Sequence, residues 1–150
     1  MMVDDRSQQG SGLVAPNNYR FPLRVYIEDT DAGGIVYYVN YLKYMERCRT
    51  EFFRALGYDK PAILDQGLLL VVHSADIQYR RPAQLDDSLL ASAGIEQLKR
   101  TSVSFRQGVW RGNQLLCEGL IRIACVDPAG FKPRPLPAPI YQQLASILES

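Results

Sequence analysis

The feature that most constrains the fold is a single helical repeat in a chain whose other apolar segments alternate like strands. Between Asn40 and Leu56, apolar side chains return every three or four residues. They are Tyr41, Leu42, Met45, Cys48, Phe52 and Phe53. Asn40 is a suitable N-cap and Gly57 a suitable stop, so the spacing predicts a helix about 25 Å long. One amphipathic helix cannot bury its apolar face alone, and it therefore needs a sheet to cover it.

Five strand-like segments accompany this helix. Phe21 to Glu28 alternates apolar and polar residues, which predicts a half-buried strand. Four further runs follow the helix: 68–79, 88–98, 102–110 and 114–126. The last three are joined by links of hairpin length, Arg100-Thr101 and Arg111-Gly112-Asn113, which predicts antiparallel pairing and excludes a doubly wound parallel sheet. We therefore expect an α+β fold in the order β-α-β-β-β-β, with residues 140–149 forming a short closing helix.

The composition fits one globular domain. The chain has 150 residues, 47% of them apolar, which is enough for a core and too apolar for a disordered protein. Seventeen basic and sixteen acidic residues leave a net charge of +1, so no overall field points to nucleic acid or to an anionic membrane surface. We expect a disordered polar leader over residues 1–18 and a single domain over residues 19–150.

The cysteines and the hydropathy indicate a cytoplasmic protein. Cys48, Cys117 and Cys125 lie in apolar segments without a CxxC pair, so they are expected to be reduced thiols packed in the core. These three and the sole histidine, His73, are too scattered for a metal site, and we expect neither metal nor cofactor. The longest aliphatic run, residues 68–72, is far too short to span a bilayer, so no membrane segment is expected.

The segment from Glu28 to Gly34 is the most unusual part of the chain. Glu28, Asp29 and Asp31 place three carboxylates between a predicted strand and the start of the predicted helix. Helix N-termini stabilise anions, and their free N–H groups can polarise a carbonyl. Two interpretations are open from this arrangement alone: a tight turn whose solvated acids cap the helix, or a catalytic carboxylate.

These residues carry a resemblance to a known family. RVYIEDTDAGGIVYYVNY from Arg24 and YMERCRTE from Tyr44 resemble the Tol-Pal-associated acyl-CoA thioesterases, relatives of hydroxybenzoyl-CoA thioesterase in the hotdog superfamily. RPAQLDD from Arg81, RTSVSF from Arg100 and CVDPAGFKPRPLP from Cys125 are similar to that family in order and spacing. The resemblance covers about residues 20–140. It implies the hotdog fold, a five-stranded antiparallel sheet wrapped around one long central helix, in agreement with the order expected from the periodicity.

The resemblance implies roles for two residues near the start of the helix. Asp31 matches the family's catalytic carboxylate, which acts either as a general base on water or as a nucleophile through a mixed anhydride. The backbone N–H around Tyr38 matches the position that polarises the thioester carbonyl in the hydroxybenzoyl branch. Many Tol-Pal-associated members have His where this chain has Tyr38. Because tyrosine is neutral near pH 7, Tyr38 is expected to position the substrate, or to pack as an aromatic wall on the helix, rather than to titrate.

Coenzyme A carries phosphates, so an acyl-CoA enzyme requires cations near its binding site. Lys99, Arg100, Thr101 and Ser102 lie at a predicted hairpin and match the segment that meets the nucleotide in relatives. The alternative interpretation of this segment is a solvated turn. The secondary candidates are Arg80, Arg81, Lys132 and Arg134.

The resemblance implies an enzyme, a hydrolase that cleaves a small to medium acyl-CoA thioester to free acid and CoA. A Ser-His-Asp triad would have to use His73, and no GxSxG elbow is present, which leaves hydrolysis by a lone carboxylate. The alternative is a non-catalytic protein that binds acyl-CoA or acyl-carrier protein, which the departure at Tyr38 suggests. Hotdog active sites form where protomers meet, so a homodimer or homotetramer is also expected.

Overall fold

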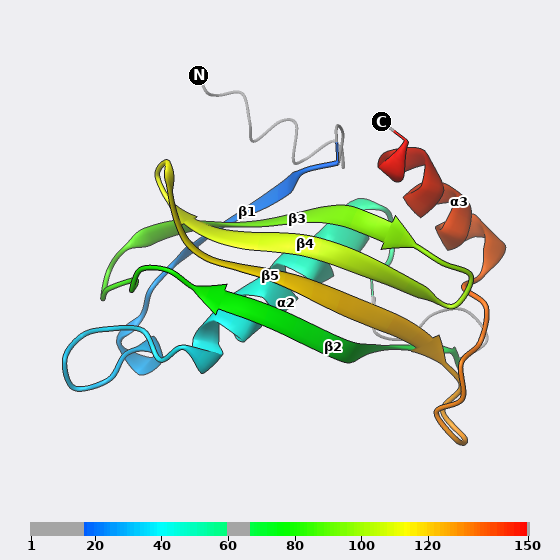
Figure 1. Ribbon diagram of the computed structural model, residues 1–150, viewed down its shortest axis with the longest axis horizontal. Coiled ribbons are helices and arrows are strands. Elements are labelled where there is room, and N and C mark those ends of the chain that lie inside the picture. Colours follow the sequence, from blue (N-terminus) through cyan, green and yellow to red (C-terminus); the bar gives the residue numbers. More distant parts are fainter. Residues whose placement is uncertain (1–16, 60–66, 150) are drawn as a thin grey trace.

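The computed structural model describes residues 17–59 and 67–149. In chain order its elements are β1 (Tyr19–Arg24), the 3-10 turn η1 (Ile27–Asp29), α2 (Val39–Ala55), β2 (Leu69–Tyr79), β3 (Ser88–Leu98), β4 (Ser102–Arg111), β5 (Gln114–Val126) and α3 (Ala138–Leu148). The strands form one antiparallel sheet in the order β1-β3-β4-β5-β2, so β1 and β2 are its edges. Figure 1 shows α2 lying along one face of this sheet. The fold class expected from the sequence is confirmed.

The apolar face of α2 packs against the sheet to form the core. Met45, Cys48 and Phe52 on this face are fully buried. The Phe52 ring meets Phe105 of β4 edge-on, with 5.2 Å between the ring centroids. Small side chains on the inward face of β3, such as Ala93, leave room for the helix. The helix therefore buries the face that its periodicity predicted.

The first strand is shorter than expected. Alternation predicted a strand over Phe21 to Glu28, but β1 pairs with β3 only over Tyr19–Arg24, and the chain then turns into η1. Ile27, which alternation places on the buried side, is 76% exposed. The physical reason is the Asp29 carboxylate, which accepts the Tyr26 N–H at 2.9 Å and closes a turn that an extended strand could not form.

The expected N-cap of the helix is wrong. α2 begins at Val39 with Tyr38 in the cap position, and Asn40 lies inside the first turn with 6% of its surface exposed. The Asn40 amide donates to the Asp29 carboxylate instead of capping its own helix. The other boundaries agree closely with expectation: β3 and β5 match, β2 begins one residue later, and β4 ends one residue later.

Most of the expected leader lies outside the described residues, but Asn17 is part of the fold. Its side-chain amide accepts the Ile95 N–H at 2.7 Å and donates to the Ile95 carbonyl at 2.9 Å. A Cβ on the neighbouring Gly94 would lie 2.6 Å from the Asn17 carbonyl oxygen, so this close approach requires glycine. In the described part of the chain, no helix has the length and apolar character needed to cross a bilayer.

Candidate active site

The turn after η1 holds Asp31 at the surface with one carboxylate oxygen fixed. Asp31 Oδ1 accepts the N–H of Gly33 at 2.8 Å and the N–H of Ile35 at 3.2 Å. The backbone closes the same turn, because the Asp31 N–H donates to the Ile35 carbonyl at 2.9 Å. Within residues 17–59 and 67–149, Asp31 Oδ2 accepts no hydrogen bond. The turn thus presents one oriented, accessible carboxylate oxygen.

The start of α2 presents open backbone donors beside this turn. The N–H groups of Asn40 and Tyr41 donate to carbonyls three residues back, at 2.9 and 3.2 Å. The N–H groups of Tyr38 and Val39 have no acceptor among the described residues. The first N–H groups of a helix lack intrahelical partners and form the positive end of its dipole. These two groups can therefore donate to an oxygen that develops negative charge.

The neighbouring carboxylates have different environments. Glu28 and Asp31 are exposed, whereas Asp29 is 5% exposed. Asp29 Oδ2 accepts the Tyr26 N–H and Asp29 Oδ1 accepts Nδ2 of Asn40, both at 2.9 Å. The sequence interpretations, a solvated turn or a catalytic acid, did not include a buried structural carboxylate.

A sequence signal for this buried pair was available. Asn40 lies four residues before Tyr44, on the helical face that carries the core residues. A polar side chain at a buried helical position needs a hydrogen-bond partner, and the nearby aspartates are suitable acceptors. Because Asn40 was interpreted as the helix cap, it was not assigned to that face, and its hydrogen bond to Asp29 was not predicted.

The aromatic ring of Tyr38 lies against the end of β2. It meets Tyr79 in a T-shaped contact with 5.5 Å between centroids, and Tyr79 meets Tyr41 at 5.6 Å. The Tyr41 hydroxyl accepts the Ala83 N–H at 2.8 Å, which fixes the buried member of the group. Burial raises the pKa of the Tyr41 and Tyr79 hydroxyls, so both stay neutral near pH 7. Tyr38 therefore belongs to an aromatic wall beside the helix start.

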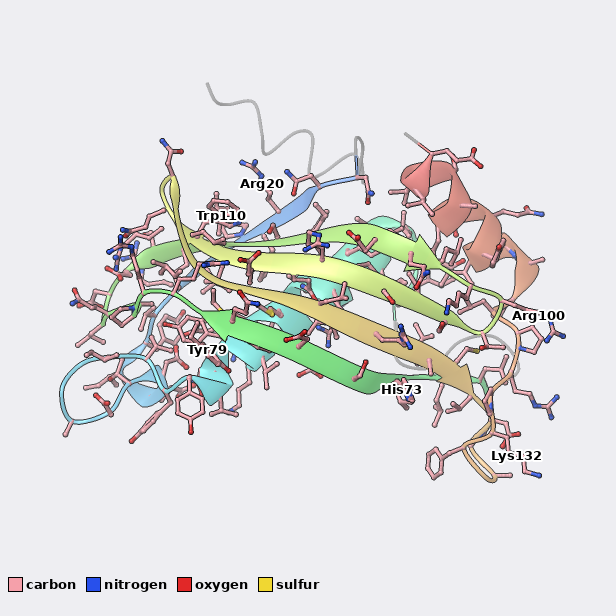
Figure 2. The ribbon with its side chains drawn as sticks, viewed as in Figure 1. Arg20, His73, Tyr79, Arg100, Trp110 and Lys132 are labelled. Carbon is pink, nitrogen blue, oxygen red and sulfur yellow. The ribbon has the colours of Figure 1, made fainter. Side chains whose placement is uncertain are left out.

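The residues predicted to bind coenzyme A lie at the other end of the sheet. Lys99–Thr101 links β3 to β4, and Ser102 begins β4. Figure 2 places Arg100 at one end of the sheet and Tyr79 at the opposite end. Lys99 and Arg100 are exposed, and neither forms an ion pair with any carboxylate that the structure describes. One protomer therefore does not bring these cations to Asp31.

The secondary cations differ in their availability. Arg134 forms an ion pair with Asp127 at 3.2 Å, and Arg80 forms one with Glu118. Lys132 and Arg81 are exposed, and Lys132 lies at the same end of the sheet as Arg100 (Figure 2). Arg100 also borders a surface cavity of about 370 Å³, whose other lining residues are Pro135, Leu136, Ala138, Tyr141 and Gln142.

The sole histidine lies apart from the Asp31 turn. His73 is exposed on β2 at an irregularity in the pairing with β5. It precedes Tyr79 by six residues, a distance of about 20 Å along an extended strand. His73 is therefore not placed to serve as a base beside Asp31.

Comparison with known proteins decides the family. Residues 33–118, more than half of the chain, match a family model described as the thioesterase superfamily. This chain belongs to the thioesterase superfamily. The matched segment includes the glycines of the Asp31 turn, all of α2, β2, β3 and β4, and the first part of β5. The family and the enzyme class expected from the sequence, a thioester hydrolase, are confirmed.

Individual thioesterases show the same likeness over nearly their whole length. The chain is 39% identical over 122 residues to the acyl-CoA thioesterase YbgC of Haemophilus influenzae, covering 81% of this chain and 90% of that protein. It is 41% identical over 126 residues to the acyl-CoA thioester hydrolase YbgC of Escherichia coli O6:H1, covering 83% and 94%. The crystal structure of a probable thioesterase from Bartonella henselae superposes with a TM-score of 0.71 at 36% identity, covering 81% of this chain and 99% of that one. The hotdog architecture is thereby confirmed.

Proposed function

We propose that this thioesterase hydrolyses acyl-CoA thioesters and that Asp31 is the reactive carboxylate. The observation that carries the proposal is the Asp31 turn, in which backbone N–H groups fix Oδ1 while Oδ2 is free and exposed. The open N–H groups of Tyr38 and Val39 lie at the adjacent helix start. The names of the similar proteins from H. influenzae and E. coli support the substrate class.

The proposed reaction adds water to the thioester and releases CoA. The C–S bond breaks, a new C–O bond forms, and the CoA thiolate takes up a proton. As a general base, Asp31 Oδ2 removes a proton from the attacking water. As a nucleophile, Oδ2 attacks the carbonyl carbon, and water then hydrolyses the mixed anhydride. Both routes place negative charge on the thioester oxygen, which the N–H groups of Tyr38 and Val39 can stabilise.

We also infer that the active enzyme is a dimer in which β2 pairs with its own copy. β2 is an edge strand without proline, and Val72 and Tyr79 on its helix side are 53% and 46% exposed. The opposite edge, β1, carries Pro22 in its interior and an arginine two residues to each side, Arg20 and Arg24, and both features discourage edge pairing. The unprotected edge is therefore β2.

Such a dimer would unite the two groups of predicted site residues. Antiparallel pairing about a two-fold axis sets the Leu69 end of one β2 beside the Tyr79 end of the other. Lys99–Ser102 lies at the Leu69 end, because Ala124 of β5 pairs with Ser102 and the neighbouring Val126 pairs with Leu69. The CoA cations of one protomer would thus approach the Asp31 of its partner.

We further infer a small to medium acyl group and a cytoplasmic enzyme. The exposed apolar side chains around the Asp31 turn come from η1, the turn itself, the helix start and two nearby positions, namely Tyr26, Ile27, Ile35, Tyr37, Tyr38, Val39, Leu42, Tyr79 and Leu85. Part of this surface would be covered by the partner in the proposed dimer, which leaves a limited area for the acyl group. The three cysteines are free and buried, as expected in a reducing compartment.

The test is thiol release from a panel of acyl-CoAs, with short aliphatic, long aliphatic and hydroxybenzoyl members. Asp31→Asn should lower kcat by roughly 1000-fold or more while KM changes little, because the amide can neither accept a proton nor attack efficiently. Glu28→Gln is the matched control, since it neutralises an exposed acid of the same segment. Full activity of Asp31→Asn would refute the mechanism. Saturable binding without thiol release by the wild-type protein would support the non-catalytic alternative.

A further inference from the structure

We propose that Asp29 and Asn40 are positioning residues that hold the two halves of the proposed site at a fixed separation. The inference rests on the proposed function, because the two halves are the Asp31 carboxylate and the open N–H groups at the start of α2. Residues 32–37 join these halves and include the consecutive glycines Gly33 and Gly34. The middle of this loop is held by the segment before β3, because the Val36 N–H donates to the Ala83 carbonyl and the Leu85 N–H donates to the Gly34 carbonyl. The junction of the loop with the helix start needs a separate constraint to keep the two halves in register.

Asp29 supplies that constraint by bonding to the helix start on both sides of the open donors. Its carbonyl oxygen accepts the Tyr37 N–H at 3.0 Å, and its Oδ1 accepts Nδ2 of Asn40 at 2.9 Å. Tyr37 and Asn40 flank Tyr38 and Val39 in the chain, whose N–H groups are open. Because Asp29 precedes Asp31 by two residues, the same residue links the helix start to the Asp31 turn.

The pair is buried and geometrically demanding. Asp29 is 5% and Asn40 6% exposed, and no cation of the described residues forms an ion pair with Asp29. Hydrogen bonds from the Tyr26 N–H and Asn40 therefore stabilise the carboxylate, and loss of either leaves a buried acceptor unsatisfied. The buried Tyr44 hydroxyl lies beside it without a formed hydrogen bond, and burial followed by the charge of Asp29 raises the Tyr44 pKa.

The first test compares kcat, KM and the thermal midpoint of two variants that each lose a buried polar group. Asp29→Ala removes the acceptor of Tyr26 and Asn40, and we expect kcat to fall roughly 100-fold while KM stays within about threefold. Gln107→Met is the matched control. Gln107 is also buried, accepts a bond from Arg49 at 2.8 Å and donates to the Met45 carbonyl at 3.0 Å, away from the Asp31 turn. We expect it to lower the midpoint while kcat stays within about twofold.

An exchange of the two side chains gives a second readout. Asn40→Asp alone brings two carboxylates together and should lower kcat strongly. The double variant Asp29→Asn/Asn40→Asp lets the amide at position 29 donate to the carboxylate at position 40, while its oxygen still accepts the Tyr26 N–H. We expect the double variant to recover at least about tenfold in kcat over Asn40→Asp, which independent destabilising changes would not do.

The outcomes separate this inference from the proposed function. Equal losses of kcat in Asp29→Ala and Gln107→Met at similar midpoints, or a double variant no better than Asn40→Asp, would overturn the positioning role. If Asp29→Ala does not fold, Asn40→Ala can be compared with Gln107→Met instead, because it removes only one of the hydrogen-bond donors to Asp29. An inactive Asp31→Asn beside a fully active Asp29→Ala would overturn the positioning role alone. A fully active Asp31→Asn would overturn the proposed mechanism itself.

Discussion

Asp29 and Asp31 differ in chemistry because their surroundings differ. Asp29 is buried, and both of its carboxylate oxygens accept hydrogen bonds, so neither is available to a substrate or to water. Asp31 is exposed, with one oxygen held by two N–H groups and the other free. A base must reach the proton that it removes, which only the accessible oxygen can do. The two side chains are chemically identical, so at the residue scale the hydrogen bonds that their oxygens accept are what distinguish them.

The role of Tyr38 can be tested through its backbone. Its φ of −64° already matches proline, and its N–H has no acceptor in the described structure. Tyr38→Pro therefore removes the proposed oxyanion donor with little change in φ, whereas Tyr38→Phe removes only the hydroxyl. We expect Tyr38→Pro to lower kcat by roughly 100-fold and Tyr38→Phe to stay within about threefold. A larger loss in Tyr38→Phe than in Tyr38→Pro would assign the role to the hydroxyl instead.

Two buried thiols predict a fall in stability at alkaline pH. Burial raises the pKa of Cys48 and of Cys117 to about 12. In the unfolded chain these thiols ionise at about pH 8.5, so above that pH the unfolded state loses protons that the folded state keeps. The free energy of unfolding should therefore fall as pH rises from about 9 to 11, by up to about 1.4 kcal/mol per pH unit for each thiol.

Urea unfolding at several alkaline pH values measures this dependence. The double variant Cys48→Ala/Cys117→Ala should show a shallower fall over the same range, because it has no thiol to ionise at either position. An unchanged slope would show that other groups, such as the buried tyrosines, cause the alkaline loss. Below about pH 8, the difference between the free energies of unfolding of the two proteins should not change with pH.

At the scale of elements, the two edges of the sheet are built differently. β1 is short, contains Pro22 and loses its pairing where Asp29 turns the chain into η1. β2 is eleven residues long and contains no proline, and its outer edge has no strand partner within the described residues. Proteins protect strand edges with proline, charge and short length. β2 contains no proline and is not short. The contrast favours β2 as the edge that associates.

A charge on the helix side of β2 should separate the proposed dimer. Val72→Lys places an ammonium group on an exposed apolar position of this strand. Size-exclusion chromatography with light scattering should then report the 16.9 kDa monomer. Leu120→Lys is the control, because Leu120 is 37% exposed on β5, where it pairs with Asp76 of β2 inside the sheet. Dissociation by Leu120→Lys with a stable Val72→Lys dimer would move the interface to another face.

At the scale of the whole molecule, one chain holds the two parts of the predicted site at opposite ends. The Asp31 turn and Tyr38 lie near the Tyr79 end of β2, and Lys99–Ser102 lies near the Leu69 end (Figure 1). An extended β2 separates these ends by about 33 Å. That is too far for the reactive carboxylate and the cations of one protomer to contact the same substrate molecule. A second copy related by a two-fold axis removes this separation.

Subunit complementation tests the shared site. Asp31→Asn and Lys99→Glu/Arg100→Glu should each be weakly active as homodimers. Coexpression with two different tags allows the mixed dimer to be purified. It should regain about half of the wild-type activity, because one of its two sites then has both Asp31 and the cations intact. No recovery in the mixed dimer would place the complete site within one protomer.

Local patterns in the sequence determined most of the fold. The 3.6-residue period located α2, alternation located β2 to β5, and hairpin-length links set their antiparallel order. The Asp31 turn was also predictable, because turn-forming residues depend on neighbours in the chain. These features need no knowledge of what lies across the core.

The tertiary structure decided the features that depend on residues distant in sequence. Asn40 pairs with Asp29, which lies eleven residues away, and this contact displaced the expected cap. The strand order left β2 as an open edge and set Lys99–Ser102 at the far end from Asp31. A local pattern shows which residues are polar or apolar, but the partner that satisfies a buried carboxylate and the strand that covers an edge are fixed only when the whole chain packs.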